Sequence, residues 1–325
     1  MPYTKPFVTV IVPCFNTAQY LGATLTSVQA QTFRDFEAIM VDDGSTDGTL
    51  SIMQDFARRD ARFKVISLQL NQGIVPARNV ALAQASGEYI AMLDGDDIWT
   101  PDALAVRVEI AQRHPAADVI ATDFAWFENE PPSQPTGRVG LGPRGLQLLA
   151  KSSTRLEPIV LNNPFEMVAK THFAWVGATL VGRKAMTAVG NFDPQFKGPE
   201  DTLLWLRLAQ HGSFVFTPRI TAFYRQRVGS IVSLLKGPKE LHYLKVLDWV
   251  RSQPEYSERI GVIDAVAAEC HHVCAQYYCR LGEHASGCRH ALSAVVKQPK
   301  SLHYWRHLGA ASLNATRSRP KMATP

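Results

Sequence analysis

The stretch Phe7-Val8-Thr9-Val10-Ile11-Val12 decides the fold class, together with two similar runs further along the chain. These runs are Phe36–Val41 and Tyr89–Leu93, and all three are short and rich in apolar β-branched or aromatic residues. An apolar run of this length is typical of a strand buried on both faces of a sheet. Helical spacing of apolar residues occurs between the runs, for example over residues 21–28. The alternation predicts an α/β fold of Rossmann-like type, with a twisted, mostly parallel sheet and helices on both faces.

Length and composition indicate a globular protein. The chain has 325 residues, of which 46% are apolar and 19% charged, enough for one large α/β domain with an appendage, or for two domains. No apolar run reaches the ~18–20 residues that span a bilayer, and the first residues do not resemble a signal peptide. The five cysteines are an odd number and none needs a disulfide partner. We therefore expect a cytoplasmic protein.

The net excess of basic residues lies entirely in the C-terminal part of the chain. Residues 1–235 contain 21 Lys and Arg against 22 Asp and Glu, whereas residues 236–325 contain 13 against 7. The second part also keeps helical apolar spacing, for example over residues 266–281. We predict one domain over residues 1–235, with halves at 1–125 and 126–235. A helical region that ends in a loose tail is predicted to follow over residues 236–325.

The pattern after the third apolar run predicts further elements of the larger domain. A helix is expected near Ile159–Ala169, a strand at Ala178–Gly182 and another helix that begins at Glu200-Asp201. Two short strands, Phe214–Thr217 and Thr221–Arg225, are expected to close the domain.

Unusual polar residues follow three of the predicted strands, at the ends where ligands bind in an open parallel sheet. They are Pro13-Cys14-Phe15-Asn16, Asp42-Asp43-Gly44-Ser45 and Asp94-Gly95-Asp96-Asp97. Acids gathered at neighbouring strand ends repel one another unless a cation or hydrogen-bond donors lie between them. A magnesium or manganese ion with a phosphorylated ligand meets this need, because such ions prefer one or two carboxylates with phosphate oxygens and water.

Two further motifs lie at predicted helix starts. Arg78 belongs to a Gly- and Pro-containing turn over residues 72–79, where it is suited to hold phosphates or a nucleoside. Glu200-Asp201 follows Gly198-Pro199, and a carboxylate there is suited to act as a general base. Each motif alone has a structural explanation as a turn, a helix start or a surface residue. Their order and spacing together favour a site.

Several segments follow one another in a specific order: Val10-Ile11-Val12-Pro13-Cys14-Phe15-Asn16, Gln31-Thr32-Phe33, Phe36-Glu37, Val41-Asp42-Asp43-Gly44-Ser45-Thr46-Asp47, Asn71-x-Gly73, Ala77-Arg78-Asn79, Gly87-Glu88-Tyr89-Ile90, Leu93-Asp94-Gly95-Asp96-Asp97 and Gly198-Pro199-Glu200-Asp201-x-x-Leu204-Trp205-Leu206-Arg207. This ordered set resembles the family 2 glycosyltransferases of GT-A fold. The resemblance spans about Val8 to Arg225, some two thirds of the chain.

The resemblance implies that residues 1–235 form a GT-A catalytic domain with a nucleotide-binding half and an acceptor half. It also implies an inverting transfer from a nucleotide-diphosphate sugar that depends on Mn²⁺ or Mg²⁺, with Asp201 as catalytic base and Asp96 at the metal. The residues implied to bind the nucleotide sugar are Pro13, Phe15, Asn16, Asp43, Arg78, Asn79, Asp94 and Gly95. Trp175, Glu200 and Trp205 are candidates on the acceptor side. The expected acceptor is a saccharide or lipid-linked saccharide, in bacterial-type surface polysaccharide or glycolipid assembly.

One departure and two alternatives qualify this hypothesis. The Gln-x-x-Arg-Trp signature of processive polysaccharide synthases is absent, and Tyr224–Ser230 lies where it is expected, which favours a non-processive enzyme. A catalytically inactive nucleotide-sugar-binding protein on the same scaffold is one alternative. The other is a haloacid-dehalogenase-like phosphatase, with Asp94 as nucleophile; against it, Ile98-Trp99 replaces the usual Gly-Thr. A dinucleotide-binding oxidoreductase would carry a Gly-x-Gly-x-x-Gly turn, which this sequence lacks.

The C-terminal region suggests two further hypotheses. Cysteines and histidines crowd in it and invite a zinc site: Cys270, His271, His272, Cys274, Cys279, His284, Cys288 and His290. Cys270 and Cys274 share an apolar helical stripe, however, which favours core packing over zinc. The basic excess and the aromatic and basic mix at residues 302–306 favour peripheral association with the inner face of the plasma membrane, with a solvated helical surface as the alternative. No clustered Lys/Arg run indicates nucleic-acid binding, and the sequence does not define the oligomeric state.

Overall fold

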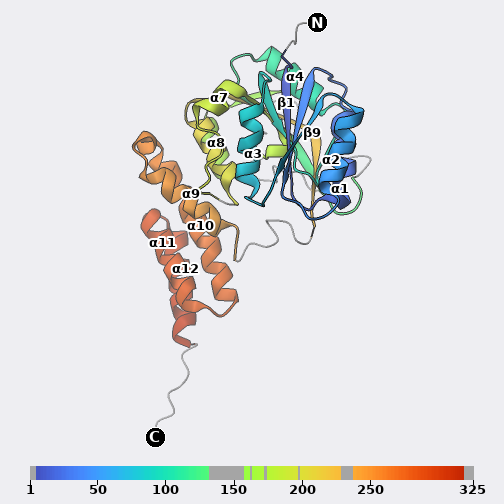
Figure 1. Cartoon of the computed structure of the whole chain (residues 1–325). Helices are drawn as coiled ribbons and strands as arrows, with labels where there is room; N and C mark the ends of the chain where they lie inside the picture. The colour runs from blue at the N-terminus through green and yellow to red at the C-terminus, as the bar shows by residue number, and fades with distance from the viewer. Residues whose placement is uncertain are drawn as a thin grey trace. The chain divides into compact units, whose positions relative to one another are not determined.

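The computed structural model describes residues 5–131, 157–161, 163–171, 174–196, 198–227 and 237–317. The chain forms two compact units, Met1–Val228 and Gly229–Pro325 (Figure 1). The first unit contains a mixed sheet with helices around it, and the second unit is helical.

A nine-stranded sheet forms the centre of the first unit, in the order β3-β2-β1-β4-β8-β6-β9-β5, with β7 paired to β9. β1 is parallel to its neighbours β2 and β4, and β2 is parallel to β3. β8 runs antiparallel between β4 and β6, and β6 and β9 are parallel. The bounds are β1 Val8–Cys14, β2 Phe36–Asp43, β3 Phe63–Leu68, β4 Tyr89–Met92, β5 Ile98–Trp99, β6 Val119–Phe127, β7 Ile159–Leu161, β8 Thr179–Gly182 and β9 Phe214–Arg225. The predicted α/β class is confirmed, and the continuously parallel part of the sheet is its N-terminal half.

Helices lie on both sides of this sheet, with α3 and α8 on one side and α1 and α2 on the other (Figure 1). They bury the apolar residues whose spacing predicts them; in α1, for example, Leu21, Leu25 and Val28 are buried. The bounds are α1 Ala18–Gln29, α2 Thr49–Arg59, α3 Ile74–Gln84, α4 Ala103–Arg113, α6 Pro164–Thr171, η1 Val176–Ala178, α7 Arg183–Ala188 and α8 Glu200–His211.

Two predicted elements differ from the observed ones, each next to a proline. The helix expected at Ile159–Ala169 is instead strand β7 followed by helix α6, which begins at Pro164. Proline disfavours helical backbone in the residue before it and is favoured in the first turn of a helix, so it separates the two elements. The two strands expected around Pro218 are one strand, β9, whose register against β6 shifts locally. This irregularity accommodates a residue that has no N–H to donate to the sheet.

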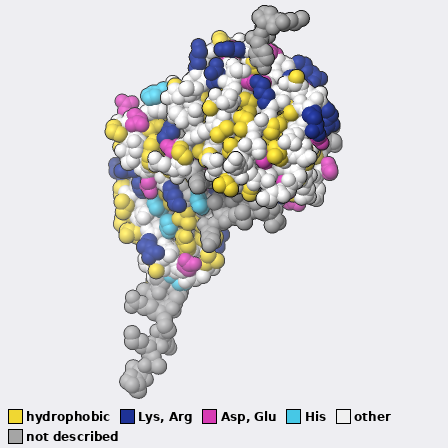
Figure 2. Space-filling view, in the orientation of Figure 1, with side chains coloured by type: hydrophobic (Ala, Val, Ile, Leu, Met, Phe, Trp, Pro, Cys, Tyr) yellow, Lys and Arg dark blue, Asp and Glu magenta, His cyan; other side chains and the backbone are white. Residues whose placement is uncertain are grey.

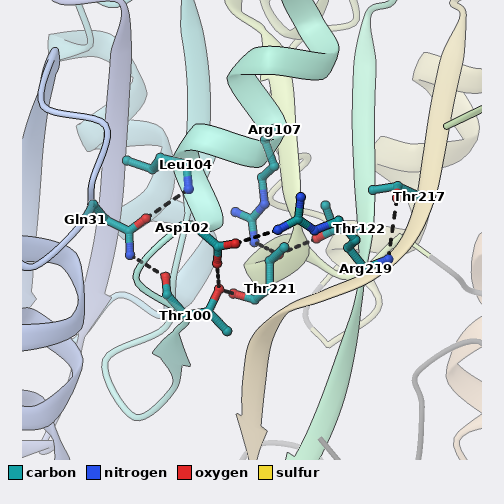
Figure 3. A network of polar contacts seen from close by, with 9 residues as sticks. All are labelled: Gln31, Thr100, Asp102, Leu104, Arg107, Thr122, Thr217, Arg219 and Thr221. Atoms are coloured by element: carbon teal, nitrogen blue, oxygen red, sulfur yellow. Dashed lines mark hydrogen bonds and ion pairs between the residues drawn. The ribbon is translucent and has the colours of Figure 1, made fainter. Parts of the chain in front are cut away.

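A buried polar network joins α4 to the second half of the sheet. Figure 3 shows Arg107 of α4 pointing toward Thr221 and Thr122. Arg107 is 0% exposed, and it donates hydrogen bonds to Thr221 Oγ1 at 2.8 Å and to the Gly177 carbonyl at 3.0 Å. The hydroxyl groups of Thr221 and Thr122 are 2.6 Å apart. Because these partners are neutral, burial dominates and lowers the pKa of Arg107 to about 9. Arg107 therefore orders the backbone around η1 through neutral hydrogen-bond partners, and the Asp102 carboxylate only partly opposes the lowering of its pKa.

From residue 237 the described chain is helical, as predicted. The bounds are α9 Glu240–Ser252, η3 Pro254–Arg259, α10 Ile260–Arg280, α11 His284–Lys297 and α12 Leu302–Arg317. Helix α10 packs against α9, α11 and α12. Cys270 and Cys274 are buried in it, and burial raises the pKa of each thiol to about 12. Neutral, buried thiols support the core-packing interpretation of these cysteines. None of the described helices is long and apolar enough to cross a membrane.

Candidate active site

The carboxyl ends of β1, β2 and β4 lie side by side at one edge of the sheet, because these strands are parallel neighbours. The turn after β4 packs closely against the end of β1 at Gly95. A Cβ atom on Gly95 would lie 3.0 Å from both Cys14 Sγ and Thr17 Oγ1, so a side chain there would push the turn away. Burial raises the pKa of the Cys14 thiol, and the nearby Asp94 and Asp96 carboxylates raise it further. The structure thus brings the acids after β4 to the end of β1, as predicted.

Arg78, near the start of α3, joins two of the acidic motifs. Its Nη2 donates to Asp94 Oδ1 at 2.8 Å, and its Nη1 donates to Glu200 Oε1 at 2.9 Å. The side chain is 2% exposed, and its guanidinium carbon lies 5.1 Å from the ring centroid of Phe192. Although burial disfavours the charged form, Asp94 and Glu200 raise the pKa of Arg78. Arg78 therefore fixes the turn after β4 against the start of α8.

Three carboxylates lie around this guanidinium: those of Asp94, Glu200 and Asp201. Burial raises the pKa of Glu200 to about 7, with Arg78 opposing the shift and Asp201 adding to it. One positive charge does not neutralise three negative charges, so this part of the site favours a bound proton or an additional cation.

Asp201, the predicted base, is the second residue of α8. Its Oδ1 accepts hydrogen bonds from the backbone N–H of Thr202 at 2.6 Å and from the Thr202 hydroxyl at 3.3 Å. Within the described parts of the chain, its Oδ2 accepts no hydrogen bond. Burial raises the pKa of Asp201. A general base needs one oxygen held in place, one oxygen open to the substrate and a raised pKa, and Asp201 has all three.

Asp96, the predicted metal ligand, forms an ion pair that the sequence did not reveal. Arg227 Nε donates to Asp96 Oδ2 at 2.6 Å. Arg225, at the end of β9, donates from its Nε to the Asp96 carbonyl at 2.8 Å and from its backbone N–H to Asp97 Oδ1 at 2.7 Å. Arg225 and Arg227 therefore attach the end of β9 to the turn after β4. Both arginines lie within Tyr224–Ser230, which sequence reasoning used only to exclude a processive motif.

The residues of this turn fit an oxygen-ligated divalent cation. Asp97 Oδ2 is buried and has no hydrogen-bond partner among the described residues. Burial raises the pKa of both Asp96 and Asp97, and Asp94 raises it further in each. Together with Glu200 and Asp201, five carboxylates lie around three arginines, Arg78, Arg225 and Arg227. Carboxylate oxygens are the ligands that Mg²⁺ and Mn²⁺ prefer.

Asp43, a predicted nucleotide ligand, is engaged with the chain itself. Its two carboxylate oxygens accept hydrogen bonds from the backbone N–H groups of Gln72 and Gly73, at 2.9 and 2.7 Å. The next residue, Gly44, has φ +72°, and a Cβ there would lie 2.8 Å from the Asn71 nitrogen. Asp43 and Gly44 therefore hold the loop that leads into α3 and Arg78. A direct contact of Asp43 with the nucleotide stays a prediction.

The other predicted nucleotide-binding residues differ in how available they are. Phe15 is 43% exposed beyond the end of β1, whereas Pro13 is buried. Asn16 Oδ1 accepts a hydrogen bond from the backbone N–H of Thr46 at 2.9 Å. The Asn79 side-chain amide bonds the backbone of residue 192 through both its nitrogen and its oxygen, at 2.8 and 3.3 Å. Asn79 therefore holds the backbone of residue 192, whose ring lies against Arg78, and is less suited to contact a ligand.

The three residues predicted on the acceptor side lie in different surroundings. The Trp175 ring packs against Tyr224, with centroids 5.3 Å apart. Burial and then Asp97, Asp94 and Asp96 raise the pKa of Tyr224, so this aromatic pair borders the acidic turn. Trp205 is 3% exposed within α8, which suits packing rather than acceptor contact. Glu200 bonds Arg78 and so lies with the nucleotide-binding candidates.

The sheet is parallel over β3-β2-β1-β4 and mixed beyond it, with acids and a buried arginine at its carboxyl edge, which is the arrangement of a GT-A type fold. The family model "Glycosyl transferase family 2" matches residues 9–185, more than half of the chain. The chain belongs to this family. A haloacid-dehalogenase-like phosphatase, the alternative weighed above, is thereby excluded.

Related proteins agree with this assignment. TuaG of Bacillus subtilis (strain 168), named provisionally as a teichuronic acid biosynthesis glycosyltransferase, is 42% identical over 113 residues, which cover 35% of this chain and 45% of TuaG. EpsE of the same organism, also named provisionally as a glycosyltransferase, is 29% identical over 210 residues, 64% of this chain and 68% of EpsE. The chain thus aligns with less than half of the length of TuaG.

Solved structures share the fold. S. aureus TarS 1–349, crystallised with UDP-GlcNAc, superposes with a TM-score of 0.61 and 17% identity, covering 91% of this chain and 93% of that one. The mannosyltransferase PcManGT from Pyrobaculum calidifontis, in complex with GDP-Man and Mn²⁺, gives a TM-score of 0.58 and 19% identity over 97% of this chain and 82% of that one. At these identities the likeness establishes the GT-A fold alone.

Proposed function

We propose that this protein transfers one sugar from a nucleotide-diphosphate sugar to an acceptor hydroxyl, with inversion at the anomeric carbon. The observation that carries the proposal is the cluster at the carboxyl edge of the sheet. There Arg78 bonds Asp94 and Glu200, with Asp201 beside them. The names of relatives such as TuaG support a saccharide or lipid-linked saccharide acceptor in surface polysaccharide or glycolipid assembly.

Residues 1–125 form the nucleotide-binding half in this proposal. Phe15, exposed beyond β1, offers a ring face for the base, and Asn16 lies beside it. Arg78 supplies positive charge near the donor phosphates and, through its bonds to Asp94 and Glu200, holds the turn after β4 against the start of α8. Asp43 fixes the loop that carries Arg78, and Gly95 leaves room for the turn that carries Asp94.

Asp96 would hold the divalent cation, with Asp94 in the same turn. When bound, Mn²⁺ or Mg²⁺ supplies Lewis-acid stabilisation of negative charge on the diphosphate. Arg227 now bonds Asp96 Oδ2. A cation held by Asp96 would compete with this ion pair and would leave the Arg227 guanidinium to the donor diphosphate.

Asp201 takes the proton of the acceptor hydroxyl through its unbonded Oδ2, while Thr202 holds Oδ1 in place. The hydroxyl oxygen then attacks the anomeric carbon as the bond to the diphosphate oxygen breaks, and the electron pair leaves with the diphosphate. Attack from the face opposite the leaving group inverts the configuration. Residues 126–235 form the acceptor half, where the Trp175–Tyr224 pair offers an aromatic surface to a sugar ring.

A two-stage experiment tests the function. Nucleotide sugars are first screened by thermal shift with and without Mn²⁺, and those that stabilise the protein are then incubated with candidate acceptors. We expect a metal-dependent stabilisation, followed by a product whose anomeric configuration, read by NMR coupling constants, is opposite to that of the donor. Stabilisation without transfer to any acceptor and without donor hydrolysis would instead support a catalytically inactive binding protein. A product with retained configuration would contradict the inverting mechanism.

Peripheral association with the inner face of the plasma membrane forms part of the proposal. The C-terminal unit has large apolar side chains that are more than half exposed: Leu281, Leu292, Val296, Leu302, Trp305 and Leu313. Figure 2 shows apolar side chains next to Lys and Arg on this unit. Basic groups near an anionic bilayer contribute about 1 kcal/mol each.

Vesicle sedimentation tests the association. We expect the full chain to sediment with anionic vesicles at low salt and less at high salt or with neutral vesicles. Trp305→Ser is expected to reduce sedimentation, whereas Leu70→Ser, at a residue 76% exposed on the first unit, is the matched control. Sedimentation that is independent of salt and of Trp305 would contradict the proposal.

A further inference from the structure

Three histidines of the C-terminal unit meet between helices α10 and α12. His272 belongs to α10, and His303 and His307 lie one turn apart on α12. One ring nitrogen from each lies within 4.8 Å of those of the other two. The rings meet edge to face, with centroids 4.1 Å apart for His272 and His307 and 4.7 Å apart for His303 and His307.

The ligand chemistry of this triad differs from that of the acidic turn. Three imidazole nitrogens without a carboxylate suit zinc, copper or nickel, whereas Mg²⁺ and Mn²⁺ prefer oxygen. In a tetrahedral zinc site with Zn–N bonds of about 2.0–2.1 Å, the nitrogens lie roughly 3.3 Å apart. The triad nitrogens lie within 4.8 Å of one another, so the closure needed is at most about 1.5 Å. Small rotations of the exposed His303 ring and the half-exposed His307 ring close that gap.

We propose that His272, His303 and His307 bind a divalent transition-metal ion, with Zn²⁺ as the reference ion, which clips α12 to α10. Two ligands one turn apart on one helix and a third from a neighbouring helix form a three-point site with an open coordination position. The residues therefore bind metal without any change in the helical packing.

The surroundings of the triad support this assignment. The Gln276 amide nitrogen, one turn beyond His272, lies 2.9 Å from His272 Nε2. With this amide turned over, its oxygen accepts the Nε2–H, which orients the ring and leaves His272 Nδ1 to the metal. The Tyr304 hydroxyl donates to Glu269 Oε2 at 3.2 Å and holds α12 against α10 beside the site. Such hydrogen bonds around the ligands commonly fix the ring orientation in metal sites.

The neighbouring histidine pair makes a useful contrast. His271 and His290 approach through their Nδ1 atoms at 2.9 Å, and His290 stacks on Tyr278 with parallel rings. These two rings satisfy each other and offer no third ligand among the described residues. The proposed metal site therefore uses His303 and His307, which lie outside the crowded stretch that suggested zinc from the sequence.

Calorimetric titration of the metal-stripped full chain with Zn²⁺, without nucleotide, tests the site. We expect one Zn²⁺ per chain. His303→Gln should weaken binding at least 10-fold, because it removes a ligand at an exposed position where folding is not at stake. His290→Gln, in the neighbouring pair, is the matched control and should bind like the wild type. Asp96→Asn should also retain this binding, which separates it from any metal at the acidic turn.

Hydrogen exchange provides a second measurement. Zn²⁺ should slow exchange of the α12 amides in the wild type and in His290→Gln, and leave them unchanged in His303→Gln. The absence of a stoichiometric Zn²⁺ site, or a site lost with His290→Gln but kept in His303→Gln, would overturn the proposal. In that case the triad is a packed cluster of imidazoles.

Discussion

Arg78 and Arg107 are both fully buried in the first unit, yet they have opposite surroundings. Arg78 bonds the carboxylates of Asp94 and Glu200, and these raise its pKa. Arg107 bonds a carbonyl and a hydroxyl, and burial lowers its pKa to about 9. The first arginine balances an excess of negative charge at the candidate active site, whereas the second orders neutral groups in the core.

The comparison shows that the protein accepts an electrostatic cost at the candidate active site and not in the core. Two of the three acceptors bonded by Arg107 have a second donor: the Gly177 carbonyl also accepts from Trp99 Nε1 at 2.6 Å, and Thr221 pairs with Thr122. Around Arg78 the carboxylates outnumber the cation. A core network of the first kind joins one cation to neutral acceptors, while a cluster of the second kind favours a further cation or a proton.

Replacing each arginine in turn should lower the free energy of unfolding by very different amounts. At pH 8, Arg78→Met should lower the free energy of unfolding by about 3–5 kcal/mol, because it leaves buried carboxylates without a partner. Arg107→Met should lower it by only about 1 kcal/mol, since two of the three acceptors keep other donors. Urea unfolding at pH 8 measures both values.

Arg113→Met, on the exposed face of α4, is the control for both substitutions and should change the free energy of unfolding by less than about 0.5 kcal/mol. A larger loss for Arg107→Met than for Arg78→Met would reverse the distinction between the two arginines.

Asp201→Asn tests whether Asp201 acts in catalysis or only contributes to the charge balance around Arg78. The substitution keeps the shape and removes the basicity, so turnover should fall by ~10² or more while the affinity for nucleoside diphosphate stays nearly unchanged. Steady-state kinetics with calorimetry of the diphosphate tests this. Turnover within a few-fold of the wild type would remove Asp201 from the mechanism.

The pH dependence of stability offers a finer test of the same cluster. A carboxyl group whose pKa rises from 4.5 to about 7 on folding keeps its proton in the folded state after the unfolded chain has lost it. The unfolded state then binds fewer protons, so stability falls as the pH rises from 4.5 to about 7. Glu200→Gln should flatten this fall by roughly 1–2 kcal/mol.

The control for this measurement is Glu109→Gln, at an exposed residue paired with Arg113 on α4. This variant should keep the wild-type pH dependence of the unfolding midpoint. Equal slopes for Glu200→Gln and the wild type would show that Glu200 titrates normally in the folded protein.

The sequence predicted those parts of the fold that depend on local pattern. Each buried run at the start of the chain has the length and composition of a strand, and β1, β2 and β4 lie where the runs do. The antiparallel entry of β8 between β4 and β6 depends on contacts between distant segments, which no local period encodes. The helix predicted at Ile159–Ala169 ran through Pro164, where the structure changes from strand to helix, and the two strands predicted on either side of Pro218 are one strand.

The candidate site was predictable where a motif follows a strand or opens a helix. Asp94, Asp96, Arg78 and Asp201 were singled out in this way. Arg225 and Arg227 were not, because an arginine after a strand has no signature of its own. Their role depends on β9 ending beside the turn after β4, which is a consequence of topology. The histidine triad was missed for the same reason, since α10 and α12 bring its members together.

The central claim is that the acids after β4 hold a donor diphosphate through a divalent cation. Calorimetric titration of wild type and Asp96→Ala with nucleoside diphosphate, each with and without Mn²⁺, tests it most directly. We predict that Mn²⁺ strengthens binding to the wild type and that Asp96→Ala loses most of this gain, while the two proteins bind alike without metal. An equal loss of affinity in both conditions, or binding to the wild type that is indifferent to Mn²⁺, would contradict the claim.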